Sequence, residues 1–500
     1  MYLQNIADIL TTLIYFPILV RMLSQEEVGL TVTLGLILAL ATTLGSLSLP
    51  KAITKFVAEE VGKGCWGAVR NLYKKSLQLS IGLGGIASLV LLIIYSVFSY
   101  YFSSFGLISP LIVLLSTDIL ILSVSGFLNG FFYGLQKFKE IAIIAILSNI
   151  VRVISVIIML FLNYSIVGVL TGWIMGDFWG VVLYLFSAHR DVSPLVGEDE
   201  ARATLELIKY STPLYGTSIL GYLSSYIDRF LLLSLMGLSE LAVYSVAVTA
   251  SSFLGMVTYP ISYVLFPFFS ELRGKNSDEG MRIASLKVTR YLSLIFIPMA
   301  LGIAVVSYPA ITIFAGVGYV NAALPLAIFC VTMAFTQIGV ATTPTLLALG
   351  KTKALLNGQI LGVVSNIFIV LMLAPFLGIN GAALGRMGLM FTSLGYTVYV
   401  LVKSYGFYVD KEAFAKAWVS SLTMAMIVFV TQSYLSFDAR LTLLYVLLGF
   451  ITYIAMLKWL KVVNYEDYLF FKSLFPRRFR KALDLFIKLF GIKNQDPKEA

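Results

Sequence analysis

The lysines and arginines of this 500-residue chain are distributed unevenly along the sequence. Thirty-one of the 36 fall in every second gap between long apolar segments, or in the tail after the last segment. Cationic side chains are retained on the cytoplasmic face during membrane insertion, so basic loops alternate with almost uncharged ones in a chain that crosses the bilayer repeatedly. The pattern therefore predicts an all-α, polytopic membrane protein.

The composition agrees with this prediction. Hydrophobic residues make up 59% of the chain and charged residues 12%, against about 25% charged in soluble domains. The net charge of +10 does not indicate nucleic-acid binding, because the cations flank membrane exits and form no stripe with exposed aromatic residues. Two cysteines and one histidine give neither a disulfide framework nor a zinc cluster, so we expect no metal site and no cofactor.

A helix needs about 20 apolar residues to cross the bilayer core. About fourteen segments meet this requirement, and they are predicted at 2–23, 28–49, 76–102, 107–132, 141–162, 165–187, 209–236, 239–269, 289–314, 319–349, 354–376, 379–403, 413–435 and 440–461. The first segment is too long for the core of a signal peptide and lacks a basic start. We expect it to remain as the first transmembrane helix.

The even-numbered gaps carry the cations, whereas the odd-numbered gaps carry only Arg21 and Arg440 at their margins. The second gap alone holds Lys51, Lys55, Lys63, Arg70, Lys74 and Lys75, and the tail adds ten cations between Lys458 and Lys498. This distribution predicts that both termini are cytoplasmic in a multi-pass protein of the cell membrane. The outer connections are too short for a catalytic domain, so we expect no catalytic residues.

The chain also repeats itself at an offset of about 213 residues. Residues 27–32 align with 240–245, and residues 164–168 with 377–381, after which Gly172 matches Gly385. Because each half contains an even number of helices, the copies have the same orientation across the membrane. We predict one six-helix lobe at 1–190, a second at 205–405, two additional helices at 413–461 and a basic cytoplasmic tail at 462–500. Two parallel lobes imply a cleft between them, and the alternative is a duplication retained for packing alone.

Seven charged residues remain inside the predicted helices: Asp8, Asp118, Arg152, Asp177, Asp228, Arg229 and Arg386. An ionised group at the bilayer centre costs about 3 kcal/mol or more, so each should face the protein interior or water. Helical spacing places Tyr15 on the same face as Asp8, and it places Tyr222 and Ser225 on polar faces beside Asp228 and Arg229. These faces are expected to line the cleft.

The charged residues suggest two kinds of site. Guanidinium groups suit the phosphate of an anionic substrate, so the substrate-binding candidates are Arg229, Arg386, Arg152, Tyr15, Tyr222 and Ser225. An unpaired carboxylate could instead bind a coupling proton or sodium ion, and the candidates are Asp8, Asp118, Asp177 and Asp228. The alternative is structural ion pairing, of Asp228 with Arg229 and of Arg152 with Asp118 or Asp177.

The tail contains an amphipathic pattern between residues 477 and 490. Leu483, Phe486, Ile487 and Phe490 share one face at helical spacing, and the other face carries Lys481 and Lys488. A basic amphipathic helix of this kind lies on anionic membrane lipids. We expect an interfacial anchor, with partner binding as the alternative.

Several segments resemble the polysaccharide-transport branch of the multidrug, oligosaccharidyl-lipid and polysaccharide exporter superfamily. These segments are residues 21–30 (RMLSQEEVGL), 48–53 (SLPKAI), 134–138 (GLQKF), 239–245 (SELAVYS) and the pair Asp228-Arg229. The resemblance extends over nearly the whole chain.

The resemblance implies a flippase with two six-helix lobes in a V and two extra carboxy-terminal helices. Such a protein turns a lipid-linked oligosaccharide from the cytoplasmic to the outer leaflet by alternating access, commonly with H⁺ or Na⁺, for polysaccharide or glycoprotein glycan assembly. We expect it to act as a monomer. The alternatives are a cation-coupled multidrug or small-molecule exporter of the same superfamily and, from another class, a non-transporting membrane scaffold.

Overall fold

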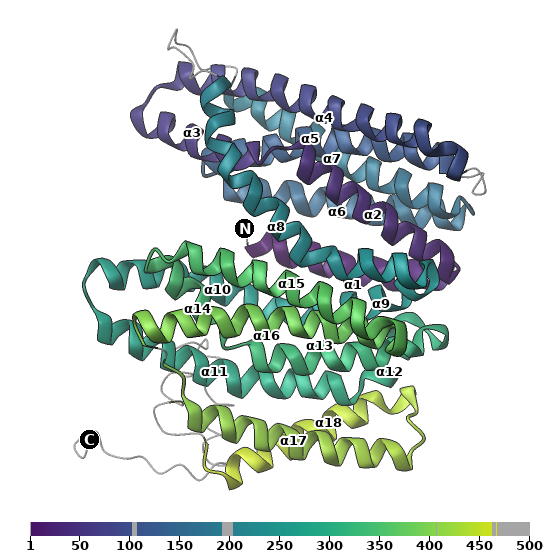
Figure 1. Cartoon of the computed structure of the whole chain (residues 1–500), viewed down its shortest axis with the longest axis vertical. Helices are drawn as coiled ribbons and strands as arrows, with labels where there is room; N and C mark the ends of the chain where they lie inside the picture. The colour runs from purple at the N-terminus through teal and green to yellow at the C-terminus, as the bar shows by residue number, and fades with distance from the viewer. Residues whose placement is uncertain (1, 103–107, 193–203, 407, 463–466, 468–500) are drawn as a thin grey trace.

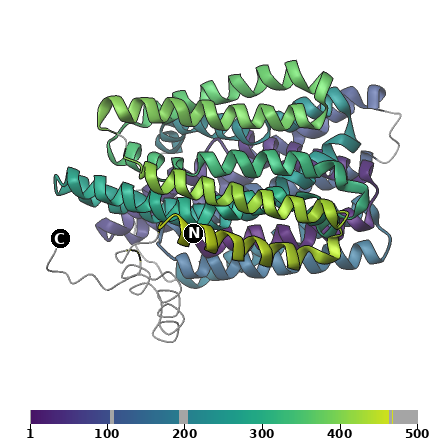
Figure 2. The ribbon, with the colours of Figure 1, turned by 90° about the horizontal axis from the view of Figure 1, so that it is seen from below.

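The computed structural model describes residues 2–102, 108–192, 204–406, 408–462 and 467. Over these residues the chain is almost entirely helical and contains no strand. Figure 1 shows the helices of the N-terminal half at the top, those of the second half below them, and the last two helices at the bottom. Figure 2 shows that the long helices share one general direction. The all-α prediction is confirmed.

The N-terminal half comprises α1 (Tyr2–Met22), α2 (Gln25–Gly45), α3 (Leu49–Lys63), α4 (Trp66–Phe102), α5 (Ile108–Gly134), α6 (Phe138–Phe161) and α7 (Ser165–Val192). The second half comprises α8 (Thr204–Met236), α9 (Leu238–Ser251), η1 (Ser252–Leu254), α10 (Gly255–Gly274), α11 (Asp278–Val305), α12 (Ser307–Ala315), η2 (Val317–Ala322), α13 (Ala323–Thr336), α14 (Gly339–Ala348), α15 (Thr352–Leu377) and α16 (Ile379–Ser404). The chain continues with α17 (Lys411–Tyr434), η3 (Ala439–Leu441) and α18 (Thr442–Trp459).

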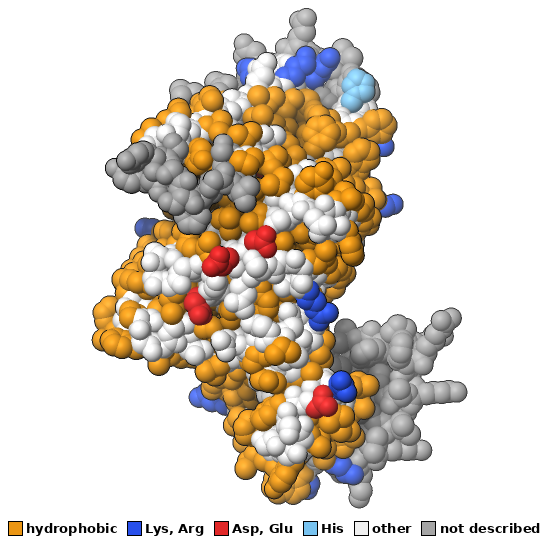
Figure 3. Space-filling view, turned by 90° about the vertical axis from the view of Figure 1, so that its right-hand side faces the viewer, with side chains coloured by type: hydrophobic (Ala, Val, Ile, Leu, Met, Phe, Trp, Pro, Cys, Tyr) orange, Lys and Arg blue, Asp and Glu red, His pale blue; other side chains and the backbone are white. Residues whose placement is uncertain are grey.

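Twelve of the described segments are long and apolar enough to span a membrane. The outer surface fits such a setting, because large apolar side chains such as Phe376, 84% exposed, and Phe186, 74% exposed, point away from the protein. Figure 3 views the side of the molecule that lies to the right in Figure 1, where hydrophobic side chains cover much of the surface and charged side chains are few. Because α1 and α16 are not among the twelve, the number of fourteen crossings stays a prediction.

The second predicted segment and the basic gap after it differ from the prediction. Residues 49–63 form the helix α3, and α4 begins at Trp66, so the cations of the gap lie on helices. A turn at 46–48 separates α2 from α3, with Leu47 and Ser48 in the left-handed region (φ 46° and 57°). Pro50 follows in the first turn of α3, where its missing N–H costs nothing. The hydropathy criterion failed here because α3 is amphipathic and is buried against protein on its apolar face.

The helix pairings of the first half recur in the second. The pairs α1 with α6, α3 with α5, α4 with α5 and α6 with α7 correspond to α8 with α15, α10 with α14, α11 with α13 and α15 with α16. We refer to α1–α7 as the N-lobe and to α8–α16 as the C-lobe. The residue boundaries given for the lobes and the tail stay predictions, and the amphipathic segment at 477–490 lies outside the described residues.

The repeated glycines lie where helices approach closely. A Cβ atom on Gly172 of α7 would come within 2.7 Å of the Val156 backbone nitrogen on α6. Its counterpart Gly385 of α16 lies against Val370 of α15, whose Cγ2 would be 2.3 Å away. Small residues let membrane helices pack backbone to backbone. This shared requirement accounts for one of the sequence matches at the 213-residue offset.

The two lobes meet in a tight seam near the turn between α1 and α2. Ser24 caps α2 in a capping box with Glu27, which fixes the direction in which the helix begins. A Cβ on Gly29 would lie 2.1 Å from the backbone oxygen of Leu238 at the start of α9. The Gln25 side-chain amide also donates to the Gly318 carbonyl oxygen at 2.7 Å. Backbone contact therefore closes this end, which we call the seam end.

A clamp around Arg290 attaches the last two helices to the C-lobe. Its guanidinium donates to both carboxylate oxygens of Asp467 at 2.9 and 2.8 Å, to Asp410 at 2.8 Å and to the Val462 carbonyl oxygen at 2.7 Å. The Asp410 carboxylate also accepts from the Ala413 amide and so caps α17. One cation thus holds the start of α17 and the segment that follows α18.

We predict that Gly29→Val opens the seam, because no side chain fits between the two backbones and overpacking costs about 1–3 kcal/mol. Spin labels at Glu26 and Val317, on opposite sides of the seam, report the separation by pulsed electron resonance. The population at short distance should fall about tenfold. Gly82→Val is the matched control, because a Cβ at Gly82 meets nothing within 4 Å. Unchanged distances in Gly29→Val would contradict the prediction.

We predict that Arg290→Ala loosens α17 and α18, because it removes the guanidinium that binds the buried Asp467, 3% exposed, and Asp410. Breaking a buried pair of this kind costs about 3 kcal/mol. Amide hydrogen exchange in these two helices should accelerate while exchange in the N-lobe stays constant. Lys287→Ala serves as the control, because Lys287 is an exposed cation on the same helix, α11. Equal exchange in the two variants would refute the clamp.

Candidate functional site

Helix α8 lies between the lobes. It packs against α15 and α16 in the C-lobe and against α2 and α3 in the N-lobe, and Figure 1 shows it crossing from one half to the other. Ser218, Tyr222, Ser225 and Arg229 recur along it at spacings of four, three and four, so they share one face. This face belongs to the candidate site.

A pocket of about 410 Å³ opens between α8 and the junction of α2 with α3. Hydroxyl-bearing side chains and one amine dominate its polar lining: Thr42, Thr43, Ser46, Ser48, Lys51, Ser218, Tyr222, Ser225 and Tyr226. Hydrogen bonds cross it from lobe to lobe, between the Ser48 and Ser218 hydroxyls at 2.8 Å and from the Lys51 amine to the Ser218 hydroxyl at 2.9 Å. We call this cavity the inter-lobe pocket.

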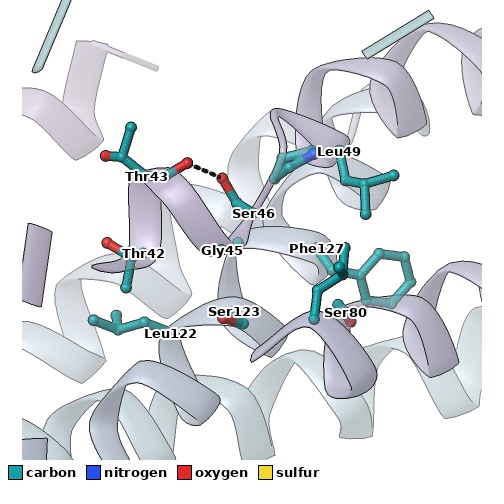
Figure 4. Close-up of a pocket in the computed structure, with 12 residues that line it drawn as sticks. Thr42, Thr43, Gly45, Ser46, Leu49, Ser80, Leu122, Ser123 and Phe127 are labelled. Atoms are coloured by element: carbon teal, nitrogen blue, oxygen red, sulfur yellow. Dashed lines mark hydrogen bonds between the residues drawn. The ribbon is translucent and has the colours of Figure 1, made fainter. Parts of the chain in front are cut away.

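A second cavity, of about 250 Å³, adjoins the inter-lobe pocket inside the N-lobe. Figure 4 shows Thr42, Thr43, Ser46, Ser80 and Ser123 around it. These hydroxyls donate to carbonyl oxygens of their own helices, as Thr43 does to Ala39 at 2.7 Å. A hydroxyl oxygen that donates in this way keeps lone pairs that accept further hydrogen bonds. The cavity is therefore suited to polar groups that carry donors, such as sugar hydroxyls.

The C-lobe contains a buried cluster centred on Asp228, which is 1% exposed. Its carboxylate accepts from the Tyr244 hydroxyl at 2.5 Å and from the Arg386 guanidinium at 2.8 Å. Arg386 also donates to the carbonyl oxygen of Ser225 at 3.3 Å. Arg229 lies over the ring of Tyr226 at 5.4 Å, and its Nε is buried without a hydrogen-bond partner among the described residues. The cluster thus contains two guanidinium groups and one carboxylate, which pairs with Arg386.

The N-lobe contains a buried cluster in which carboxylates outnumber guanidinium groups. Arg152 on α6 donates to both carboxylate oxygens of Asp177 on α7, at 2.5 and 2.6 Å. Asp118 on α5 is 2% exposed, lies close enough to interact with both, and has no hydrogen-bond donor at either oxygen within the described part of the chain. Tyr15 contacts Trp173 beside Arg152. The cluster thus contains two carboxylates and one guanidinium, which pairs with Asp177.

The structure brings the predicted site residues into three groups. Tyr222 and Ser225 line the inter-lobe pocket, although the Tyr222 hydroxyl already donates to the Leu36 carbonyl oxygen at 2.8 Å. Asp228, Arg229 and Arg386 form the C-lobe cluster, whereas Asp118, Arg152, Asp177 and Tyr15 belong to the N-lobe cluster. The Asp8 side chain lies outside the described part of the chain. The roles assigned to these residues stay predictions.

Two alternatives for ion pairing are now distinguished. Arg152 pairs with Asp177, as one alternative had it. Asp228 pairs with Arg386 at 2.8 Å, whereas the alternative paired it with its neighbour Arg229. Adjacent residues on a helix point about 100° apart, so their side chains do not face each other. The backbone amide of Arg229 donates to Asp228 at 3.0 Å, but its guanidinium makes no ion pair within the described residues.

Three residues of these sites are not predicted from the sequence: Tyr244 in the C-lobe cluster, and Lys51 and its partner Ser218 in the inter-lobe pocket. Lys51 was counted as a loop cation, and the break between α2 and α3 that brings it to the pocket has no hydropathy signal. Tyr244 lay within the repeated segment at 240–245, so the self-comparison contained a signal for it. Its aromatic character gave no reason to expect a carboxylate partner.

An apolar crevice of about 520 Å³ lies between α11, α17 and α18. Its wall includes Ile295, Met299, Val446 and Phe450. Phe450 is 63% exposed and Val446 52% exposed on the outer surface, so the crevice opens on the apolar exterior. Such a lining suits a hydrocarbon chain rather than a polar group.

Comparison with known proteins gives two sequence relatives of known name. Stage V sporulation protein B of Bacillus subtilis (strain 168) is 25% identical over 302 residues, which cover 55% of this chain and 56% of that protein. This chain thus spans just over half the length of that relative. Lipid II flippase MurJ of the same organism is 22% identical over 418 residues, covering 74% of this chain and 73% of MurJ.

Solved structures share the fold at low sequence identity. Lipid II flippase MurJ in an inward closed conformation superposes with a TM-score of 0.66 at 17% identity, covering 95% of this chain and all of that one. A multidrug resistance MATE family transporter in an inward-facing conformation gives 0.60 at 17% identity, covering 80% of this chain and 94% of that one. The family model for polysaccharide biosynthesis proteins matches residues 2–273. This chain therefore belongs to the polysaccharide biosynthesis protein family.

Proposed function

We propose that this membrane transporter is a flippase that carries a lipid-linked oligosaccharide from the cytoplasmic to the outer leaflet. The observation that carries the proposal is the hydroxyl-lined inter-lobe pocket in a protein whose outer surface is apolar. Burying a sugar hydroxyl in hydrocarbon without a hydrogen bond costs several kcal/mol. A polar pocket between two lobes removes that cost for the head group while the lipid tail stays in apolar surroundings.

The C-lobe cluster supports an anionic substrate. Its two guanidinium groups exceed its single carboxylate by one positive charge, and Arg229 makes no ion pair with the described residues. Arg229 lies on the same face of α8 as the pocket residues Tyr222 and Ser225. A guanidinium offers a planar set of donors that matches phosphate oxygens. The phosphate that joins lipid and sugar would therefore interact with Arg229 at some stage of the passage.

The N-lobe cluster supports coupling to a cation. Asp118 and Asp177 exceed Arg152 by one negative charge, and the Asp118 carboxylate has no donor within the described residues. A buried, uncompensated carboxylate is costly, and a proton or a sodium ion removes the excess charge. Binding and release of that cation would bias the two lobes between conformations that differ in its affinity.

The apolar crevice supports a lipid substrate. It borders α17 and α18, which are the helices beyond the two lobes, and it opens on the exterior that meets hydrocarbon. A prenyl or acyl chain fits its lining. A soluble-substrate exporter, the alternative within the superfamily, would have no use for such a crevice. A non-transporting scaffold, the alternative from another class, predicted no cleft between the lobes, and the inter-lobe pocket argues against it.

Arg229→Ala should reduce transport about tenfold or more while membrane insertion stays normal, because hydrogen bonds to charged groups contribute about 1.5–3 kcal/mol. The measurement is flipping of a fluorescent lipid-linked oligosaccharide in liposomes that contain the purified protein. Arg440→Ala is the control, since Arg440 is a distant cation near the connection of α17 and α18. Wild-type protein that moves a soluble cationic drug but not the lipid-linked sugar would favour the exporter.

Asp118→Asn should abolish stimulation of flipping by a cation gradient, because the amide keeps the shape of the side chain but carries no charge for the cation to neutralise. Flipping is compared with and without a proton gradient, and with and without a sodium gradient, in the same liposomes. Asp438→Asn is the control, because Asp438 caps η3 at the far end of the chain. Full stimulation in Asp118→Asn would remove this residue from coupling.

A further inference from the structure

The cations that face the inter-lobe pocket and the two clusters differ in how far they are already neutralised. Arg386 and Arg152 are paired with carboxylates at 2.8 and 2.5 Å. Lys51 has no carboxylate partner in the described part of the chain, and its amine donates to the hydroxyl of Ser218. An ammonium group has three donors, so two of them remain for another acceptor. Lys51 is exposed and lines the pocket.

The other lysines of α3 are placed differently. Lys55 lies 3.5 Å from Glu59 and over the ring of Tyr210 at 4.0 Å. Lys63 pairs with Glu60 at 2.8 Å. Lys51 alone among these three reaches the inter-lobe pocket, because the turn at 46–48 brings the first turn of α3 against α8. Of these three lysines, Lys51 therefore has its amine in a cavity that a ligand can occupy.

We propose that Lys51, together with the hydroxyls of Ser48 and Ser218, forms a phosphate-binding subsite in the inter-lobe pocket. The inference rests on the proposed function, since the ligand it assigns to this subsite is the phosphate of a lipid-linked substrate. The ammonium group supplies a full charge and two donors, and the two serines, which share one hydrogen bond, supply one further hydroxyl donor between them. Charge-assisted hydrogen bonds of this type are stronger than neutral ones. At about 410 Å³ the pocket is within the size range of pockets that bind small molecules.

The subsite spans both lobes, and this links binding to their relative position. Lys51 and Ser48 belong to the N-lobe, whereas Ser218 belongs to α8 of the C-lobe. A phosphate bound by all three is held best when the lobes keep this spacing, so it stabilises that conformation over one in which they part. Moving a substrate onward therefore requires these contacts to break.

A second cationic group lies further along the same helix face. Ser218 and Arg229 are eleven residues apart on α8, which at 1.5 Å per residue corresponds to about 16 Å. The Lys51 subsite lies further from the seam end, and Arg229 lies closer to it. If the seam end faces outward, as the loop cations predict, Lys51 captures the phosphate first and Arg229 meets it later on the path.

The test measures binding, without transport, by full-length protein in nanodiscs of zwitterionic lipid. The probes are a polyprenyl phosphate, the uncharged polyprenol of the same length, and inorganic phosphate. Lys51→Ala should weaken binding of the polyprenyl phosphate about tenfold or more, and Lys51→Arg should retain most of it. Polyprenol should bind all variants equally. The control Lys63→Ala removes a charge from the same helix outside the pocket, and it should bind polyprenyl phosphate as the wild type does.

Three results would contradict the subsite or the ligand assigned to it, and a fourth would contradict the proposed function alone. Equal binding of polyprenyl phosphate by the wild type and Lys51→Ala would refute the subsite, and so would an equal loss for the uncharged polyprenol. Wild-type affinity for inorganic phosphate equal to that for the lipid would assign the site to free phosphate instead. Absence of flipping by the wild type, with binding that depends on Lys51, would refute the proposed function and leave the subsite standing.

Discussion

The structure depends on the free energy of placing charged side chains in a molecule surrounded by hydrocarbon. An ionised group that meets lipid is costly, so each charge inside a membrane helix must find a partner or a polar cavity. Asp228 and Arg386 meet each other, as do Arg152 and Asp177. Because each of these pairs joins different helices, the same requirement that hides the charges also fixes how the helices pack. The charged clusters of the candidate site therefore lie where helices pack together and keep charges away from lipid.

Neither cluster is electrically neutral, and the two clusters carry excess charges of opposite sign. Excess positive charge in the C-lobe is suited to an anion, and excess negative charge in the N-lobe is suited to a cation. Binding of one ligand to each lobe would neutralise both, and ligands that prefer the same arrangement of the lobes favour each other's binding by an equal factor. A structure with fully paired clusters would lack the excess charges on which the proposed coupling rests.

The sequence was sufficient for the helical architecture, because hydropathy and the positive-inside pattern both follow from transfer into lipid. It was also sufficient to expect Asp118 and Asp228 in the interior, since a charge within an apolar segment has few alternatives, but it gave no sign that Glu60 and Asp467 are buried. It was insufficient for their partners, as the pairing of Asp228 with Arg386 depends on the packing of α8 against α16. It was insufficient for Lys51, because an amphipathic helix such as α3 resembles a polar loop in a hydropathy profile.

The contacts between the lobes differ in kind at different depths. At the seam end, Gly29 lies against the backbone of Leu238. Water cannot restore the van der Waals contacts that are lost if these two backbones separate. In the inter-lobe pocket the lobes are joined by hydroxyl and ammonium hydrogen bonds, at Ser48, Lys51 and Ser218. Water or a polar substrate can take over such bonds, whose net contribution is only about 1 kcal/mol each. The attachment between the lobes is therefore weaker at the pocket than at the seam.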